Sequence, residues 1–241
     1  VYSSQRHGFD TTMLFAGATV LVVLALVAIV LRGLGRPERE SADKVAAAPV
    51  KPWERLKDPL FWRIAVAAAL GLGGQVGLLA HQIPIVSAHG TAEAAAIAVT
   101  VVAAGSAIGR LAVAQASWVV PATLLAALSY GLFGTGVAVI ALSQSLTETY
   151  IGCAIAGFVV GPIVLLPPIL VRKAFGSNGY GGTYALVTVV MYVLAALVPW
   201  VVGMLHAQWG NYAGGLWVLM LLEVAAAALI IRPLPRSMTN P

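Results

Sequence analysis

Residues 119–141 read VVPATLLAALSYGLFGTGVAVIA, a stretch of 23 residues without a charged side chain. An α-helix needs about 20 consecutive apolar residues to cross the roughly 30 Å hydrocarbon core of a bilayer. The stretch lacks the alternation of apolar and polar residues that membrane β-strands have, and it is rich in Ala, Leu and Gly. It therefore predicts one membrane-spanning helix.

Six further stretches of the chain have the same character. They are, in chain order, 11–31, 60–83, 92–113, 148–170, 183–205 and 212–231. The composition of the 241 residues agrees, with 60% hydrophobic and 10% charged residues, against roughly 45–50% and about 25% in soluble domains. The sequence therefore predicts an all-α membrane protein with seven transmembrane helices, and a soluble globular domain is excluded.

The charged residues indicate how this chain threads the membrane. It has 14 Lys and Arg against 9 Asp and Glu, and its longest polar connection is 32–59. With 32–59 in the cytoplasm, every Lys and Arg except Arg6 falls on the cytoplasmic side, as the positive-inside rule requires. The N-terminus is then predicted outside and the C-terminus inside. The predicted parts are a first helix within 1–31, a cytoplasmic loop at 32–59 and a six-helix bundle at 60–241.

The loop at 32–59 marks the domain boundary. Its middle, 45–52, is a linker of Ala and Pro, and Asp58 and Pro59 predict the N-cap and the first residue of the next helix. Its basic residues are mixed with acids and follow a membrane span, which favours contact with anionic membrane lipid over nucleic acid.

Motifs for catalysis and for metal binding do not occur in the sequence. It lacks H-E-x-x-H, G-x-S-x-G and a phosphate-binding loop. The single cysteine, Cys153, excludes a disulfide framework and a cysteine-based metal site. We therefore expect no enzyme activity, no catalytic residues, no cofactor and no metal.

Arg110 is the sharpest polar feature within a predicted span. A charged residue at the centre of a bilayer costs about 2.5–3.5 kcal/mol, so it requires a partner or a wet cavity. Val99, Ala103 and Ser106 precede it at spacings of 4, 3 and 4 and share its helical face. Two interpretations stay open: an arginine whose fork binds a carboxylate, or an interfacial arginine that extends to lipid headgroups.

Other polar side chains in the spans are candidate site residues. Gln75 and Gln82 lie seven residues apart on one helical face, and the helix at 183–205 carries a polar stripe with a period of four, formed by Tyr184, Thr188 and Tyr192. The stripe either faces a cavity or joins neighbouring helices. Glycines predict close helix packing and hinges in two spans, at Gly71, Gly73, Gly74, Gly77, Gly157 and Gly161.

Three titratable side chains are candidates for proton coupling. Glu223 is a carboxylate in the middle of a predicted span, an uncommon position that marks a functional candidate. His81 is a candidate because histidine is the residue type that can change its charge near neutral pH, and Glu148 lies at the outer end of its helix. A structural role for Glu223 and a packing role for His81 are the alternatives.

Short motifs follow one another along the chain in a characteristic order. They are Lys57-Asp58-Pro59-Leu60-Phe61-Trp62, Gly74-Gln75…His81-Gln82-Ile83-Pro84, Gly105…Ile108-Gly109-Arg110-Leu111, Pro167-Pro168…Arg172…Phe175-Gly176 and Pro199…Gly203…Gly210-Asn211-Tyr212. In this order and spacing the chain resembles the major facilitator superfamily, especially its monocarboxylate and oxalate/formate antiporter branch. The resemblance implies that 11–31 is equivalent to the sixth helix, and 60–241 to the C-terminal six-helix bundle, of a twelve-helix transporter.

The resemblance implies secondary active transport of a small organic solute by alternating access. Arg110 would bind the substrate carboxylate, Ser106 stands where the family has an acid, and Gln75 would line the cavity. The oxalate-type carriers have a lysine in the helix that matches 183–205, and this chain has no Lys or Arg there. A dianion is therefore disfavoured and a monoanion or a neutral solute is favoured, with a monocarboxylate-type anion as the expected substrate. The N-terminal half of the same protein would be the partner, in a bacterial inner membrane or an equivalent plasma membrane.

The resemblance also leaves questions open. Ala114, Ser117 and Trp118 stand where the family has a glycine and an Asp-Arg pair that latch one conformation. Symport and antiport are both compatible with the sequence. The alternative function is that of a complete seven-helix receptor or photoreceptor with the same topology, although 212–231 has no lysine for a retinal Schiff base.

Overall fold

The computed structural model describes residues 51–234. They form a short 3₁₀ helix, η1 (Pro52–Lys57), and six α-helices: α3 (Pro59–Ser87), α4 (Ala92–Ala116), α5 (Ala122–Leu142), α6 (Leu146–Phe175), α7 (Tyr180–Trp209) and α8 (Ala213–Ile230). All six α-helices are long and apolar enough to cross a bilayer. The prediction of an all-α, multi-pass membrane protein is confirmed. The predicted span at 11–31 lies outside the described residues, so the count of seven stays a prediction.

The helix ends follow local sequence signals. The Oδ1 atom of Asp58 accepts a hydrogen bond of 2.8 Å from the backbone N–H of Leu60, with Pro59 in the first turn of α3, so the predicted N-cap is confirmed. Thr91 caps α4 in the same way. Helix α7 extends beyond the predicted 183–205 at both ends, because Gly179 and Gly210, both with positive φ, set its limits.

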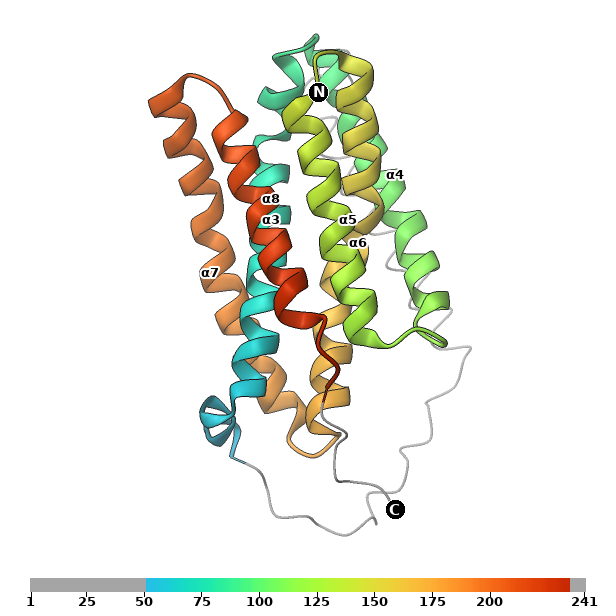
Figure 1. Cartoon of the computed structure of the whole chain (residues 1–241), viewed down its shortest axis with the longest axis vertical. Coiled ribbons are helices and arrows are strands. Elements are labelled where there is room, and N and C mark those ends of the chain that lie inside the picture. Colours follow the sequence, from blue (N-terminus) through green and yellow to red (C-terminus); the bar gives the residue numbers. More distant parts are fainter. Residues whose placement is uncertain (1–50, 235–241) are drawn as a thin grey trace, which may run out of the picture. The chain divides into compact units, whose positions relative to one another are not determined.

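Consecutive helices alternate in direction, so the first residues of α3, α5 and α7 and the last residues of α4, α6 and α8 lie at one end (Figure 1). Basic residues gather at this end: Lys51, Arg55, Lys57, Arg63, Arg172, Lys173 and Arg232. Glu93 and Glu148 lie at the start of α4 and of α6, at the opposite end. Within the described residues, this distribution agrees with the charge sorting predicted from the sequence.

The six helices form two triplets in chain order, α3 to α5 and α6 to α8, whose members have equivalent packing partners. Helix α3 packs mainly on α7 and α8, α6 packs mainly on α4 and α5, and α5 also packs on α8. Exchanging α3 with α6, α4 with α7 and α5 with α8 reproduces these pairings. Because helices three places apart run in opposite directions, the triplets have the relation of inverted repeats. Helices α4 and α7 lie at opposite edges of the bundle (Figure 1).

Glycines allow α4 and α6 to approach backbone to backbone. A Cβ atom on Gly157 of α6 would lie 2.7 Å from the Cα of Val102, and one on Gly109 of α4 would overlap the carbonyl oxygen of Phe158. Gly105 and Gly109 on one helix, like Gly157 and Gly161 on the other, have the four-residue spacing of small-residue helix contacts in membranes.

Gly157→Ala is therefore expected to destabilise the bundle by about 1–3 kcal/mol, because the atoms in its way belong to backbone that cannot rotate aside. Gly131→Ala in α5 is the matched control, since nothing lies within 4 Å of its Cβ position, and Ala favours a helix over Gly by about 1 kcal/mol. Thermal unfolding in detergent measures both. Equal melting temperatures for the two variants would contradict the α4–α6 contact.

The segment before α3 is fixed against the neighbouring ends of α6 and α7. Pro52 packs on Gly182 of α7, and the guanidinium of Arg55 lies 4.9 Å from the ring centroid of Phe175 at the end of α6. The described end of the predicted loop 32–59 is thus not merely a linker, because η1 joins the ends of α6 and α7.

Candidate functional site

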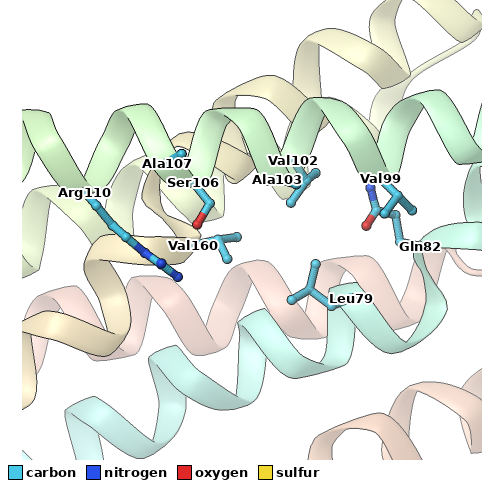
Figure 2. A pocket seen from close by; sticks show the side chains of 9 residues that line it. All are labelled: Leu79, Gln82, Val99, Val102, Ala103, Ser106, Ala107, Arg110 and Val160. Atoms are coloured by element: carbon cyan, nitrogen blue, oxygen red, sulfur yellow. The ribbon is translucent and has the colours of Figure 1, made fainter. Parts of the chain in front are cut away.

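A cavity of about 350 Å³ lies between α3, α4 and α6 (Figure 2). We call it the Arg110 groove. It is lined by Leu79 and Gln82 of α3, by Val99, Val102, Ala103, Ser106, Ala107 and Arg110 of α4, and by Val160 of α6. Ser106 and Gln82 are buried, whereas Val99, Ala103 and Arg110 are exposed, so the groove has a buried floor and an open side. The predicted helical face that ends at Arg110 is confirmed, since all four of its residues line the groove.

Glycine in α6 makes room for the arginine side chain. A Cβ atom on Gly161 would lie 2.5 Å from both Cγ and Nε of Arg110 and 2.7 Å from the carbonyl oxygen of Ser106. Arg110 lies six residues before the end of α4, which corresponds to about 9 Å along the helix. Its side chain extends into the groove on the side of Val160 (Figure 2).

None of the acids of residues 51–234 is among the residues that line the groove. Glu93 and Glu148 lie at the opposite end of the bundle, and Glu223 is enclosed among α3, α5 and α8. The remaining two, Glu54 and Asp58, precede α3. The positive charge of Arg110 is therefore available to an anion from outside this part of the chain.

Polar groups of three kinds are spread along the groove. The guanidinium of Arg110 lies at one end, the hydroxyl of Ser106 near it, and the amide of Gln82 at the other end (Figure 2). Apolar side chains, those of Leu79, Val102 and Val160 among them, line the space between. The Gln82 Nε2 atom also lies 4.0 Å from the buried Sγ of Cys153, which holds this amide against α6. Such a site can bind a small anion with an apolar body.

Gln75, which the resemblance places in the cavity, does not line the groove. It is buried in α3, and its Oε1 atom has no hydrogen-bond partner within the described structure. Gln82, seven residues later on the same face, lines the groove instead. The spacing of seven correctly indicated a shared face, but it could not indicate which of the two amides lies at the open part.

The polar stripe of α7 does not reach the Arg110 groove. The Thr188 hydroxyl donates a hydrogen bond of 2.8 Å to the carbonyl oxygen of Tyr184, one turn earlier in the same helix. The ring of Tyr184 stacks on that of Tyr180 at a centroid distance of 5.8 Å, and the side chain of Tyr192 is 54% exposed. In the described bundle this stripe therefore belongs to a separate surface on α7.

His81 and Glu148 have structural contacts. A ring nitrogen of His81 lies 3.0 Å from the carbonyl oxygen of Pro199, which connects α3 to α7. The Oε2 atom of Glu148 accepts hydrogen bonds from the N–H groups of Gln144 and Ser145 and completes a capping box at the start of α6. These contacts support the packing alternative for His81 and give Glu148 a helix-capping role.

The close approach of α4 and α6 is the feature that the sequence interpretation missed at this site. The sequence predicts Gly161 as a packing and hinge point without naming its partner, and in the structure its neighbour is Arg110. The signal was present, because Gly105, Gly109, Gly157 and Gly161 form two four-residue spacings that predict one helix pair.

Comparison with known proteins assigns no family to the chain. No family model matches it, and no curated protein matches it significantly. Function is therefore inferred from the bundle, the groove and the sequence motifs.

Proposed function

We propose that the chain is part of a secondary transporter of the major facilitator type, which moves a small monocarboxylate-type anion across a membrane by alternating access. The observation that carries the proposal is the Arg110 groove, where an arginine without a protein counter-charge in residues 51–234 extends into a partly apolar cavity inside a membrane bundle. The inverted packing of the two helix triplets supports it, because such repeats are typical of these transporters.

The chemistry of the groove favours one carboxylate. A guanidinium offers parallel N–H donors that match the two oxygens of a carboxylate. Arg110 is the one cation among the lining residues, so a monoanion balances the charge. The Ser106 hydroxyl adds a neutral hydrogen-bonding group, and the apolar side chains suit a short carbon skeleton.

The open side of the groove supports a partner bundle. Val99, Ala103 and Arg110 are exposed along one side of α4, and a cavity open to lipid would not shield an anion from the hydrocarbon. We propose that the N-terminal half of the same protein covers this side, in a bacterial inner membrane or an equivalent plasma membrane.

Uptake into proteoliposomes tests the proposed function. The full-length protein should accumulate labelled lactate, pyruvate or acetate, and the unlabelled acids should compete. The matching neutral amides, such as lactamide, should compete weakly, because they lack the charge that pairs with Arg110. Equal competition by acid and amide would contradict an anion site.

The orientation in the membrane gives a separate expected result. In a Cys153→Ser background, Gln208→Cys at the end of α7 should react with an impermeant thiol reagent added to intact cells, and Lys173→Cys at the end of α6 should not. Both native side chains are exposed, so access decides the outcome. Labelling of position 173 but not 208 would reverse the predicted topology.

A further inference from the structure

Buried polar side chains meet at the junction of α3, α5 and α8, outside the Arg110 groove. Glu223 of α8 and Tyr130 of α5 are each 0% exposed. Both carboxyl oxygens of Glu223 and the hydroxyl oxygen of Tyr130 lack a hydrogen-bond partner within the described structure. Buried polar atoms in proteins are nearly always hydrogen-bonded, so three unpartnered atoms in two adjacent helices require an explanation.

Glycines of α3 and α5 form the space that these side chains occupy. A Cβ atom on Gly74 would overlap Oε1 of Glu223, and one on Gly71 would overlap the ring of Tyr130. From α5, a Cβ on Gly134 would lie 3.2 Å from the Cβ of Glu223. Gly71 and Gly74 are three residues apart on α3, and Tyr130 and Gly134 are four apart on α5, so carboxyl and hydroxyl lie along the same helix faces.

The helices packed on α8 bring no cation of the described residues to Glu223. Helix α5 presents the hydroxyl of Tyr130 as its titratable group. On α3, Arg63 and His81 lie toward the two ends and contact the carbonyl oxygens of Arg232 and Pro199. At the level of Gly73 and Gly77, α7 contributes the apolar Val198. The titratable side chains of α7 are Tyr180, Tyr184, Tyr192 and His206.

Glu223 is 0% exposed, and its carboxyl oxygens have no hydrogen bond within the described structure. Burying an ionised carboxylate without a hydrogen bond or a counter-charge is strongly unfavourable. We propose that Glu223 is a proton-binding site. Its carboxyl group is the neutral acid in the closed junction described here, and it loses the proton to water when α8 and α3 separate. The step is –COOH ⇌ –COO⁻ + H⁺, and the buried side chain of Tyr130 packs on the same stretch of α3. The coupling of this proton to anion movement rests on the proposed transport function.

In this proposal the proton leaves toward a second cavity, at the end of the bundle where α8 begins. It has a volume of about 490 Å³ and is bounded by the ends of α3 and α5 and by the turn between α7 and α8. His89, Ser143 and Asn211 are among its polar lining residues. Leu216 of α8 also lines it, seven residues before Glu223, which corresponds to about 10 Å along the helix.

Infrared difference spectra between the wild type and each variant, recorded on the full chain in nanodiscs, test the proton site without a transport measurement. At neutral pH the wild type should show a carbonyl band of a protonated carboxylic acid, and Glu223→Gln should remove it. Tyr130→Phe should keep the band and shift its frequency. Glu148→Gln, at the exposed cap of α6, is the control that should leave the band unchanged. A band that is absent from the wild type, or that survives in Glu223→Gln, would overturn the assignment.

Transport measurements then test the coupling. With an inward proton gradient, the wild type should concentrate labelled lactate, whereas Glu223→Gln should lose the gradient-driven accumulation and keep exchange of labelled for unlabelled lactate. Gradient-driven accumulation by Glu223→Gln at the wild-type level would overturn the coupling. If the wild type moves no monocarboxylate at all, the proposed function fails, and the infrared band still decides whether Glu223 holds a proton.

Discussion

Arg110→Lys is expected to weaken the apparent affinity for a transported monocarboxylate by roughly 10- to 150-fold. A hydrogen bond to a charged group contributes about 1.5–3 kcal/mol, and lysine keeps the positive charge but cannot offer the parallel pair of donors that a guanidinium offers. Initial uptake rates measured against substrate concentration, in the full-length protein, give the size of the effect.

Two further variants separate binding from general effects of charge. Arg172→Lys changes an exposed arginine in the last turn of α6 and should leave the kinetics unchanged. Ser106→Ala removes one neutral hydroxyl from the groove and should weaken the free energy of substrate binding by about 0.5–1.5 kcal/mol. Wild-type kinetics in Arg110→Lys would place this arginine at the lipid interface, where lysine serves as well.

Gly161→Val is expected to impair uptake about as strongly as Arg110→Lys. The added Cβ would lie 2.5 Å from two atoms of the Arg110 side chain, so the flexible arginine must leave its position in the groove. The added Cβ would also lie 2.7 Å from the backbone carbonyl oxygen of Ser106, so the bundle is expected to lose stability as well. Uptake is therefore compared per amount of folded protein, which size-exclusion chromatography in detergent measures.

Gly131→Val is the matched control, because nothing lies within 4 Å of the Cβ position at Gly131. The double variant Gly161→Val/Arg110→Lys should lose no more substrate affinity than the more impaired of its two single variants, since both changes disturb the same interaction. Additive losses would show that Gly161 and Arg110 act independently.

Local helix geometry made part of this protein predictable from its sequence. The six described spans, the Asp58 cap and the shared face of Ser106 and Arg110 follow from apolar length, capping chemistry and the 3.6-residue period. Each depends on residues close together in the chain, so neighbouring helices do not change the result.

The partners of each helix face could not be predicted in the same way. The sequence places Glu223 in the middle of a span but does not show what surrounds it, and its side chain is fully enclosed because Gly74 and Gly134 leave room for it. Gln75 and Gln82 share one face of α3, and it is the packing of α4 that decides which of them lines the groove. Such contacts join residues far apart in the sequence, where periodicity carries no information.

Binding of a carboxylate at Arg110 is the central claim, and thermal unfolding of the purified full-length protein with added ligand tests it most directly. A ligand at 100 times its dissociation constant stabilises the folded state by about 2.7 kcal/mol. Lactate is expected to raise the melting temperature of the wild type, lactamide is expected to leave it unchanged, and Arg110→Lys should respond weakly to both. Equal shifts with acid and amide, or an undiminished shift in Arg110→Lys, would contradict it.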